Sequence, residues 1–143
     1  RLTDPFDMIM VAAPDYLRAK GEPESLADLA QHNCIGYRLQ ASGSLYVWDV
    51  VENGRDTKVA TSGSAVITDA MAVRELALAG VGIAYLSEIM VREDLRAGRL
   101  KWLLPEAAMR EEGLFVYFPR RASMAPKLRA FIQAAKMGTV PLC

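Results

Sequence analysis

Short apolar runs alternate with amphipathic segments along most of this chain. The clearest case spans residues 68–86, where Thr68 or Asp69 can cap the start of a helix, Gly80 follows its end, and the apolar run VGIAYL comes next. A helix that is closed by glycine and leads directly into a buried strand is typical of crossover connections between neighbouring strands. The alternation therefore predicts an α/β fold whose sheet is mostly parallel.

The same pattern divides the rest of the chain into short elements. Asn53-Gly54 stands between two alternating segments and predicts a hairpin over residues 45–61, because both residues accept the positive φ of a type I′ turn. Pro14 suits the first turn of a helix, and Ser25 suits a helix cap. We expect strands at residues 7–13, 34–37, 64–67, 81–86, 99–104 and 113–119, and helices at residues 14–20, 25–32, 69–79, 87–97 and 126–136.

Length and composition exclude several classes of protein. With 143 residues, 52% of them hydrophobic, the chain is long enough to bury one core. The longest uncharged apolar run has 11 residues, short of the roughly 20 that a membrane-spanning helix needs, so we expect no membrane contact. Cys34 and Cys143 have no disulfide or metal-site spacing, which favours a reducing, cytoplasmic location. Because the chain starts at Arg1 without a methionine or a signal sequence, we expect a piece of a longer protein.

The charge of the chain is balanced overall but uneven along its length. The formal net charge is zero, so there is no broad basic field of the kind that binds nucleic acid. Residues 1–112 carry 12 basic and 17 acidic side chains, whereas residues 113–143 carry five basic and no acidic ones. A solvated basic helix face explains that second segment more simply than a phosphate-binding patch. We expect this chain not to bind DNA by itself.

Residue types that carry catalysis or bind metals are sparse. His32 is the only histidine and stands two residues from Cys34, so a nucleophile–base pair is one interpretation, and a helix-end histidine beside a small core cysteine is the simpler one. The glycines at 80–82 follow a helix and open a strand, the reverse of the order that dinucleotide binding requires. The adjacent acids Glu93 and Asp94 diverge on a helix. We therefore expect no enzyme active site, no catalytic residue, no metal and no cofactor.

Polar residues follow two of the predicted strands. Tyr37 and Arg38 end one strand and lead into an aperiodic loop, and Thr68 and Asp69 join another strand to the next helix. In open α/β sheets, ligands bind at the carboxyl ends of strands, where helix amino ends favour anions. These four residues form our candidate site for a carboxylate or another anion. Simple capping by Thr68 and Asp69, and a surface role for Arg38, are the alternatives.

Several segments of the sequence resemble one known family. They are APDYLRAKG at residues 13–21, LAQHNCIGYR at 29–38, ITDAMAVRELALAGVGIAYLSEIMVREDLRAGRLKWLLP at 67–105, GLFVYFP at 113–119 and PKLRAFIQAAK at 126–136. Together they are similar to the effector-binding domain of LysR-type transcriptional regulators, over nearly the whole chain. The resemblance implies a two-lobed fold like that of type 2 periplasmic binding proteins, with a small-molecule effector held between the lobes.

The resemblance also implies a layout. Residues 14–112 would form most of lobe two, residues 7–13 and 113–119 would be the crossover strands between the lobes, and residues 124–136 would be the closing helix of lobe one. The effector-binding positions would be Tyr37, Arg38, Thr68, Asp69, Pro14 and Ile83. Of these, Pro14 would lie near the hinge and Ile83 behind the pocket.

Partners follow from the same resemblance. The family's winged helix-turn-helix, its linker helix and the first part of lobe one are not in this sequence, so DNA would be bound only through parts outside this chain. The protein would be a homo-oligomer, either a dimer or a tetramer. A solute-binding protein of a transport system, which shares the two-lobed architecture, is the alternative function. Apolar side chains expected to lack full cover are Met8, Ile9, Phe115, Tyr117, Phe131 and Ile132.

Overall fold

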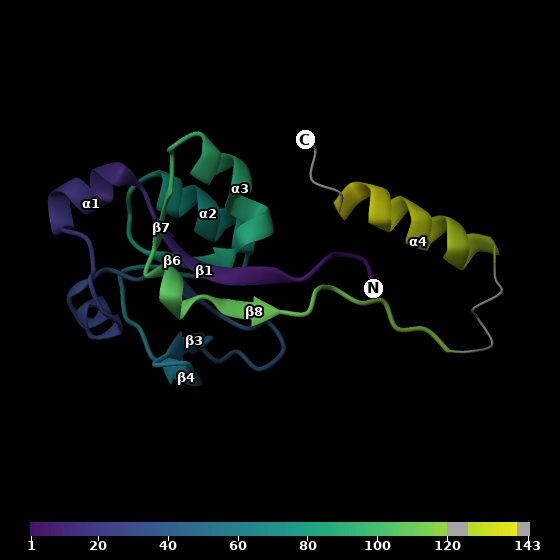
Figure 1. Cartoon of the computed structure of the whole chain (residues 1–143), viewed down its shortest axis with the longest axis horizontal. Helices are drawn as coiled ribbons and strands as arrows, with labels where there is room; N and C mark the ends of the chain where they lie inside the picture. Colours follow the sequence, from purple (N-terminus) through teal and green to yellow (C-terminus); the bar gives the residue numbers. More distant parts are fainter. Residues whose placement is uncertain (120–125, 140–143) are drawn as a thin grey trace. The chain divides into compact units, whose positions relative to one another are not determined.

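The structure is a computed structural model that describes residues 1–119 and 126–139. It divides into a larger unit, Asp7–Met109, and a smaller unit made of Arg1–Phe6 and Arg110–Cys143. Figure 1 shows the elements in chain order, which are β1 (Phe6–Ala12), α1 (Pro14–Lys20), η1 (Leu26–Gln31), β2 (Gly36–Tyr37), β3 (Trp48–Glu52), β4 (Arg55–Val59), β5 (Val66–Ile67), α2 (Ala70–Leu78), β6 (Ala84–Ser87), α3 (Glu88–Arg96), β7 (Lys101–Leu103), η2 (Pro105–Ala107), β8 (Met109–Glu111) and α4 (Pro126–Thr139).

β1 runs through the sheet of the larger unit against the direction of its neighbours. It pairs antiparallel with β6, starting at Met8↔Ser87, and antiparallel with β7 on its other side, and β8 also pairs with it. β2 pairs in parallel with β5, and a parallel bridge between Cys34 and Ile83 continues this ladder to the start of β6. β5, β2, β6 and β7 therefore share one direction. The prediction of a mostly parallel sheet is confirmed by these four strands, and β1 is an antiparallel strand among them, which the sequence pattern did not indicate.

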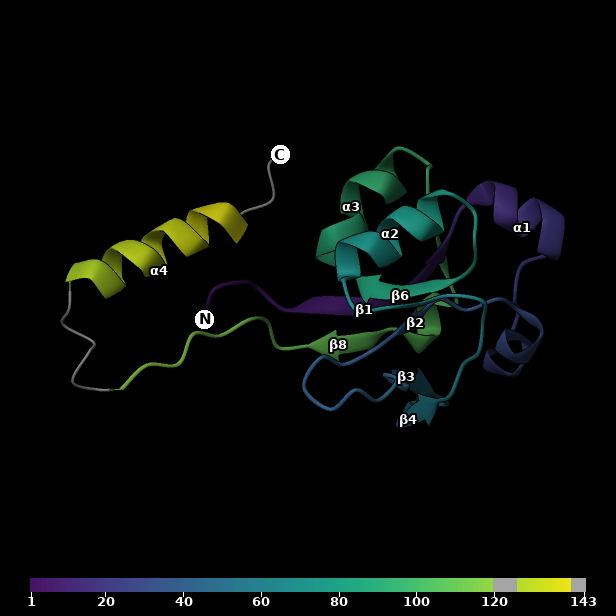
Figure 2. The same cartoon turned by 180° about the vertical axis from the view of Figure 1, so that it is seen from behind.

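Both faces of this sheet are buried along the second half of β1, which explains the apolar run Met8–Ala12. Met10 and Ala12 pack into the core cluster beneath α1, η1 and the β3–β4 hairpin, whereas Ile9 and Val11 pack into the cluster beneath α2 and α3. Figures 1 and 2 show α2 and α3 together on one face of the sheet and the hairpin on the other. A strand that is covered on both faces needs apolar residues at every position, because neither face contacts water.

The predicted hairpin is present and turns where expected. β3 and β4 pair antiparallel from Trp48↔Val59 to Glu52↔Arg55. Asn53 has φ +52° and Gly54 has φ +73°, the left-handed values that a type I′ turn requires at both positions. The turn prediction is therefore confirmed.

Other elements of the larger unit are shorter or tighter than predicted. The helix predicted at 25–32 is the 3₁₀-helix η1, Leu26–Gln31, and its Asp28 carboxylate accepts the backbone N–H groups of Glu24 and Ser25 just before it. Such a short segment suits the tighter 3₁₀ form better than a full α-helix. The predicted strands at 64–67 and 99–104 pair over only two and three residues. β8 forms in a polar stretch where no strand is predicted. Its backbone pairs with β1, and no side-chain pattern in the sequence indicates that pairing.

Residues 113–119 form no strand, contrary to the prediction. The Leu114 carbonyl accepts the Leu2 backbone N–H at 2.7 Å, while the Leu114 N–H donates to Thr3 Oγ1 at 2.9 Å. A side-chain oxygen thus takes a donor that a β-ladder would use, so the apolar composition of this segment does not make it a strand. The helix predicted at 126–136 is confirmed as α4, whereas its assignment as the closing helix of lobe one stays a prediction, and residues 124 and 125 lie outside the described residues.

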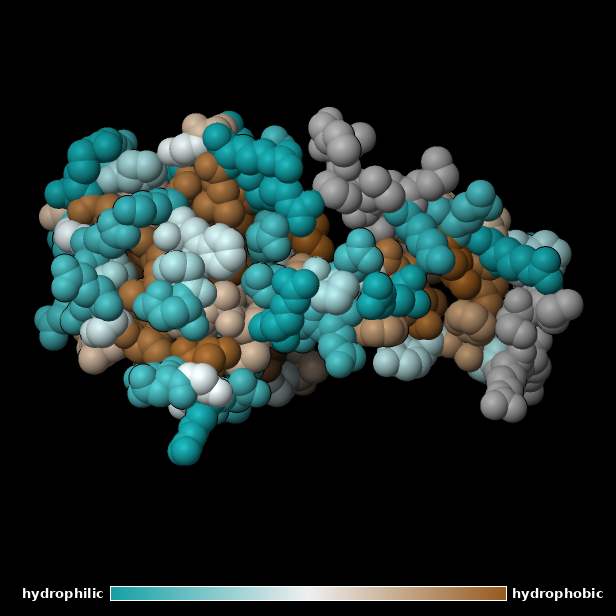
Figure 3. Space-filling view, viewed as in Figure 1, coloured by the Kyte–Doolittle hydropathy of each residue, from teal (hydrophilic) through white to brown (hydrophobic). Residues whose placement is uncertain are grey.

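Large apolar side chains are exposed on the smaller unit, as expected. Phe115, Tyr117 and Phe131 are 44%, 90% and 59% exposed. Figure 3 shows hydrophobic side chains reaching the surface beside α4. Ile9 does not share this exposure: it is only 1% exposed, because β1 lies inside the sheet of the larger unit.

A buried ion cluster holds the two helices that cover one face of the sheet. Asp94 on α3 is fully buried, and Arg74 on α2 donates to both of its carboxylate oxygens, at 2.7 and 2.8 Å. Arg99, just before β7, donates two further hydrogen bonds to Asp94 Oδ1, at 2.9 and 2.8 Å. Burial by itself raises the pKa of the Asp94 carboxyl, but the hydrogen bonds and positive charges of the two arginines outweigh it and hold that pKa below its usual value. No sequence pattern predicted this cluster, because it joins residues from α2, from α3 and from the segment before β7.

Replacing Asp94 should destabilise the fold strongly. We expect Asp94→Ala to lower the free energy of unfolding by about 3 kcal/mol, since it leaves two arginines without their buried partner. Urea denaturation measures the loss. Asp15→Ala is the matched control, because the Asp15–Arg18 pair is exposed and should change stability by less than about 1 kcal/mol. Equal losses in the two variants would contradict the importance of the cluster.

The same carboxylate predicts how stability depends on pH. A pKa that is depressed in the folded state contributes stability that is present above the unfolded-state pKa, about 3.9, and is lost as the pH falls through the folded-state value. The stability difference between wild type and Asp94→Asn should therefore be largest at neutral pH and shrink as the pH falls below about 4. Urea titrations of both proteins between pH 7 and pH 3 measure this, and a difference that grows on acidification would refute the assignment.

Candidate functional site

The parallel pairing of β2 with β5 brings the four predicted site residues to one end of the sheet. Tyr37 pairs with Ile67, and the Arg38 backbone N–H donates to the Ile67 carbonyl at 2.8 Å. Thr68 and Asp69 follow Ile67 directly and lead into α2. The two strand ends that carry the candidate residues therefore lie side by side, and their role in binding stays a prediction.

Arg38 is exposed and is oriented by the loop that follows it. Its Nη1 donates to the Gly43 carbonyl at 2.6 Å, and the loop closes where the Leu39 N–H donates to the Ser44 carbonyl at 2.9 Å. A guanidinium has five N–H donors, so one carbonyl leaves it able to bind a carboxylate as well. The loop thus holds the arginine in place without using up its donors.

Thr68 and Asp69 form the turn into α2. Asp69 Oδ1 accepts the Ala72 backbone N–H at 2.8 Å, which is the helix cap that sequence analysis offered as one of two roles. Gln40 Nε2 donates to the Thr68 carbonyl at 3.4 Å and so connects the Arg38 loop to this turn. No sequence pattern indicated Gln40, because it lies in the aperiodic loop.

Pro14 and Ile83 lie at the other end of the sheet. β1 runs antiparallel to β6 with Val11 opposite Ala84, so its carboxyl end, which leads to Pro14, lies beside the amino end of β6. Ile83 is fully buried in the core there. The chain passes between the two units at the opposite end of β1, after Phe6, so the structure does not place Pro14 near that boundary. The antiparallel direction of β1, which sequence analysis did not foresee, separates these two residues from the other four.

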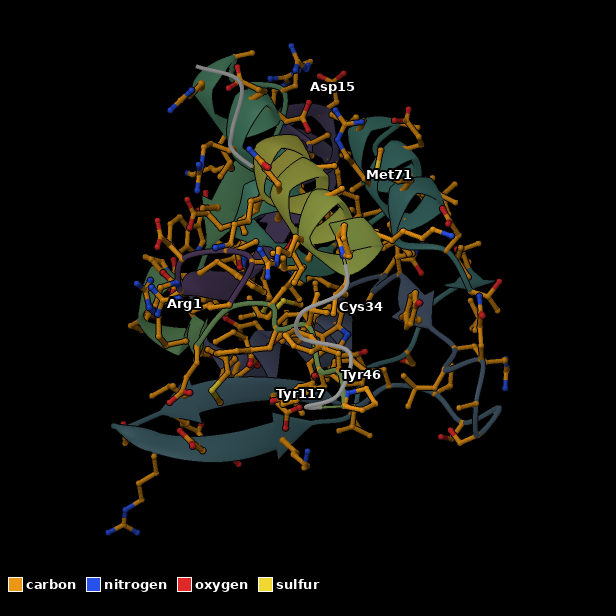
Figure 4. All side chains as sticks on the ribbon, turned by 90° about the vertical axis from the view of Figure 1, so that its right-hand side faces the viewer. Arg1, Asp15, Cys34, Tyr46, Met71 and Tyr117 are labelled. Carbon is orange, nitrogen blue, oxygen red and sulfur yellow. The ribbon has the colours of Figure 1, made fainter. Side chains whose placement is uncertain are left out.

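Three stacked aromatic side chains, which we call the aromatic column, lie beside the site. The Tyr85 ring stacks against Trp48 at 5.4 Å and against Tyr46 at 6.1 Å, and the Tyr46 backbone N–H donates to the Tyr37 carbonyl at 2.8 Å. Tyr46, labelled in Figure 4, also donates its hydroxyl to Asp49 at 2.7 Å. The hairpin is thereby anchored next to β2. The sequence pattern did not predict this column, because Tyr85 comes from a different segment of the chain from Tyr46 and Trp48.

Asp49 is the charged end of this arrangement. Lys58 on β4 donates to its carboxylate, and this bond together with the Tyr46 hydrogen bond holds the pKa of the Asp49 carboxyl below its usual value. Lys58 is therefore already paired with an acid.

His32 and Cys34 have separate partners. His32 Nδ1 lies 2.9 Å from the Tyr16 hydroxyl, which also accepts the Asn33 backbone N–H at 3.0 Å. Cys34 is 1% exposed, and its burial raises the pKa of the thiol to about 11. The thiol is therefore protonated at neutral pH and suits the predicted core role.

Two searches of the described residues gave no further candidate. They contain no group of three or more His, Cys, Asp and Glu side chains that could hold a metal ion. Within the same part of the chain, none of the helices combines the length and hydrophobicity needed to cross a membrane.

Comparison with known proteins identifies the family. The model of the LysR substrate binding domain matches residues 2–138. The chain belongs to this family. YcaN of Escherichia coli, described as an uncharacterized HTH-type transcriptional regulator, is 31% identical to this LysR substrate-binding domain over 136 residues, which cover 95% of this chain and 44% of YcaN.

Solved structures agree on the fold. The regulatory domain of CrgA, a LysR-type transcriptional regulator from Neisseria meningitidis, matches with a TM-score of 0.74 and 26% identity, over 97% of this chain and 67% of that one. Full-length AphB, a virulence activator of Vibrio cholerae, matches in fold with a TM-score of 0.76 at 21% identity, over 98% of this chain and 47% of that one. These LysR regulatory domains have the type 2 periplasmic-binding-like fold predicted from the sequence. The chain spans less than half the length of YcaN.

The burial of Cys34 predicts that its thiol is unreactive in the folded protein. Iodoacetamide at pH 8 should leave Cys34 unmodified in the native state and label it fully in urea, because only the thiolate reacts and burial suppresses both access and ionisation. Peptide mass mapping measures the labelling, and a Cys143→Ser background keeps the signal on Cys34. Rapid native labelling would revive the interpretation of Cys34 as a nucleophile.

Proposed function

We propose that this domain senses a small-molecule effector for a LysR-type transcriptional regulator. The observation that carries the proposal is the pairing of β2 with β5, which brings Tyr37, Arg38, Thr68 and Asp69 together. This cluster lies at the carboxyl ends of parallel strands, where α/β sheets bind ligands. Relatives such as YcaN and CrgA are described as transcriptional regulators, which supports the same role here.

The proposed layout keeps residues 14–112 as most of lobe two. Residues 7–13 and 113–119 would connect the lobes, although 113–119 is not a strand, and residues 124–136 would close lobe one. The division of the chain after Phe6 and after Met109 supports two connections between two bodies. In this proposal the effector, a carboxylate or another anion, binds between the lobes, with Tyr37, Arg38, Thr68 and Asp69 on the lobe-two side.

Regulation would follow from differential binding. An effector that contacts both lobes stabilises the arrangement of the lobes that it fits better, and only this difference in affinity can change the rest of the protein. In a homodimer or homotetramer, the change would reset the spacing of DNA-binding heads that lie outside this chain. DNA binding would thus belong to the amino-terminal helix-turn-helix domain, and the protein would act in the cytoplasm without catalysing a reaction.

The alternative of a transport receptor has less support. Such receptors share the two-lobed architecture, so the fold does not distinguish them. The family match and the description of YcaN as an HTH-type regulator both favour transcription control. A secretion signal ahead of this chain in the natural protein would reverse this preference.

Thr68→Ala tests the proposed site. The natural full-length protein is screened by thermal shift against a defined panel of small carboxylates, amino acids and sugars, and the dissociation constant of each ligand found is measured by calorimetry. Thr68→Ala should weaken binding by roughly 3- to 10-fold, the range expected for one hydrogen bond. Its unfolding temperature should stay within about 2 °C of wild type, because Thr68 is exposed.

Ser62→Ala is the matched control. It removes an exposed hydroxyl at the opposite end of β5, so it should change neither binding nor stability. If Thr68→Ala and Ser62→Ala both bind the ligand as wild type does, the assigned site is wrong.

A further inference from the structure

Exposed apolar side chains surround Arg38. Leu39, Leu45 and Val66 are 37%, 47% and 42% exposed, and Leu45 is the antiparallel bridge partner of Arg38. One exposed leucine needs no explanation on a protein surface, but several beside a single cation form a patch that is costly to leave in water.

Gly36 makes the patch continuous. A Cβ at this position would lie 3.3 Å from Val66 Cγ2 and 3.6 Å from Leu45 Cδ2, so these two side chains converge over the glycine. Since Gly36 adds no side chain, the backbone of β2 forms a flat base between them.

The charged side chains at the site limit the net charge of a ligand that can bind there. Among the four candidate residues Arg38 is the only cation and Asp69 is an anion, and the nearby Lys58 is paired with Asp49. One carboxylate can bind Arg38 through paired N–H donors. A second carboxylate would meet the negative charge of Asp69 and would lose hydration without a cation to replace it.

We propose that this site binds a monocarboxylate with an apolar body, the carboxylate on Arg38 and the body on Leu45, Val66 and the backbone of Gly36. The inference rests on the proposed sensing function and narrows its effector from any anion to this class. It follows from the combination of one cation with a continuous apolar patch, the composition that small-molecule sites use for orientation and for affinity. A second protein chain covering the same patch is the competing explanation, and the test includes it.

A matched set of ligands separates charge from hydrophobicity. Calorimetry at pH 7 on the natural full-length protein compares cyclohexanecarboxylate with cyclohexylmethanol, which lacks the charge, with trans-cyclohexane-1,4-dicarboxylate, which has two charges, and with acetate, which lacks the apolar body. We expect cyclohexanecarboxylate to bind at least tenfold more tightly than each of the other three. Equal or tighter binding of the alcohol, the dicarboxylate or acetate, or no binding of any of the four, would overturn the inference.

Variants assign each part of the ligand to its residues. Arg38→Gln should abolish the preference for cyclohexanecarboxylate over cyclohexylmethanol. Leu45→Ser and Val66→Ser should each lower the preference for cyclohexanecarboxylate over acetate by at least threefold, whereas the control Val47→Ser, which removes another apolar side chain that is 38% exposed, should leave it unchanged. Equal preferences in all four variants would overturn the inference.

Two further measurements separate this inference from the proposed function and from the competing surface. If Leu45→Ser and Val66→Ser change the sedimentation coefficient and not the ligand preference, the patch is a contact between protein chains and the inference is wrong. Hydrogen exchange with a ligand of another class from the screening panel locates that ligand. Protection at residues 36–40 and 66–70 would overturn the monocarboxylate class but keep the sensing site, and protection elsewhere would overturn both.

Discussion

The buried carboxylate of Asp94 is the interaction on which the arrangement of the larger unit depends. It receives hydrogen bonds from Arg74 on α2 and from Arg99 ahead of β7, while its own backbone belongs to α3. A buried charge tolerates little displacement of its partners, because any gap leaves it without compensation. α2 is therefore fixed relative to α3, and the amino end of α2, where Thr68 and Asp69 stand, is fixed with it.

The end of the sheet that lies away from Thr68 and Asp69 is held by close contact between backbone segments. A Cβ on Gly63 would lie 2.1 Å from the Cys34 carbonyl oxygen, and one on Gly82 would lie 2.1 Å from that of Asn33. The Asn33 side chain donates to the Val81 carbonyl at 2.8 Å in the same place. Only glycine allows such an approach. Close backbone packing therefore fills this end of the sheet, whereas the other end carries the polar side chains. The end with the polar side chains is the one that is open to a ligand.

Local signals in the sequence predicted much of this fold. Asn53-Gly54 predicted its turn, and the apolar run after Asp7 predicted a strand, because turn conformation and local hydrophobic patterns depend on neighbouring residues. The direction of β1 was not predicted, since it depends on which strands lie beside it. For the same reason the sequence did not indicate that Pro14 and Ile83 lie at the other end of the sheet from Tyr37, Arg38, Thr68 and Asp69. In the site, the meeting of Tyr37 with Thr68 was predictable from strand ends. Gln40 and the Tyr46–Tyr85–Trp48 column depend on contacts between segments with no shared pattern, as does the buried role of Asp94.

The antiparallel placement of β1 gives the larger unit a particular mechanical character. The chain enters this unit at Asp7 and continues at once into a strand with ladders on both sides, to β6 and to β7. A pull along β1 loads those hydrogen bonds together in shear, whereas a strand at the edge of a sheet could peel away one bond at a time. The unit should therefore follow a displacement of its entering segment as a rigid body, with little deformation of its own sheet.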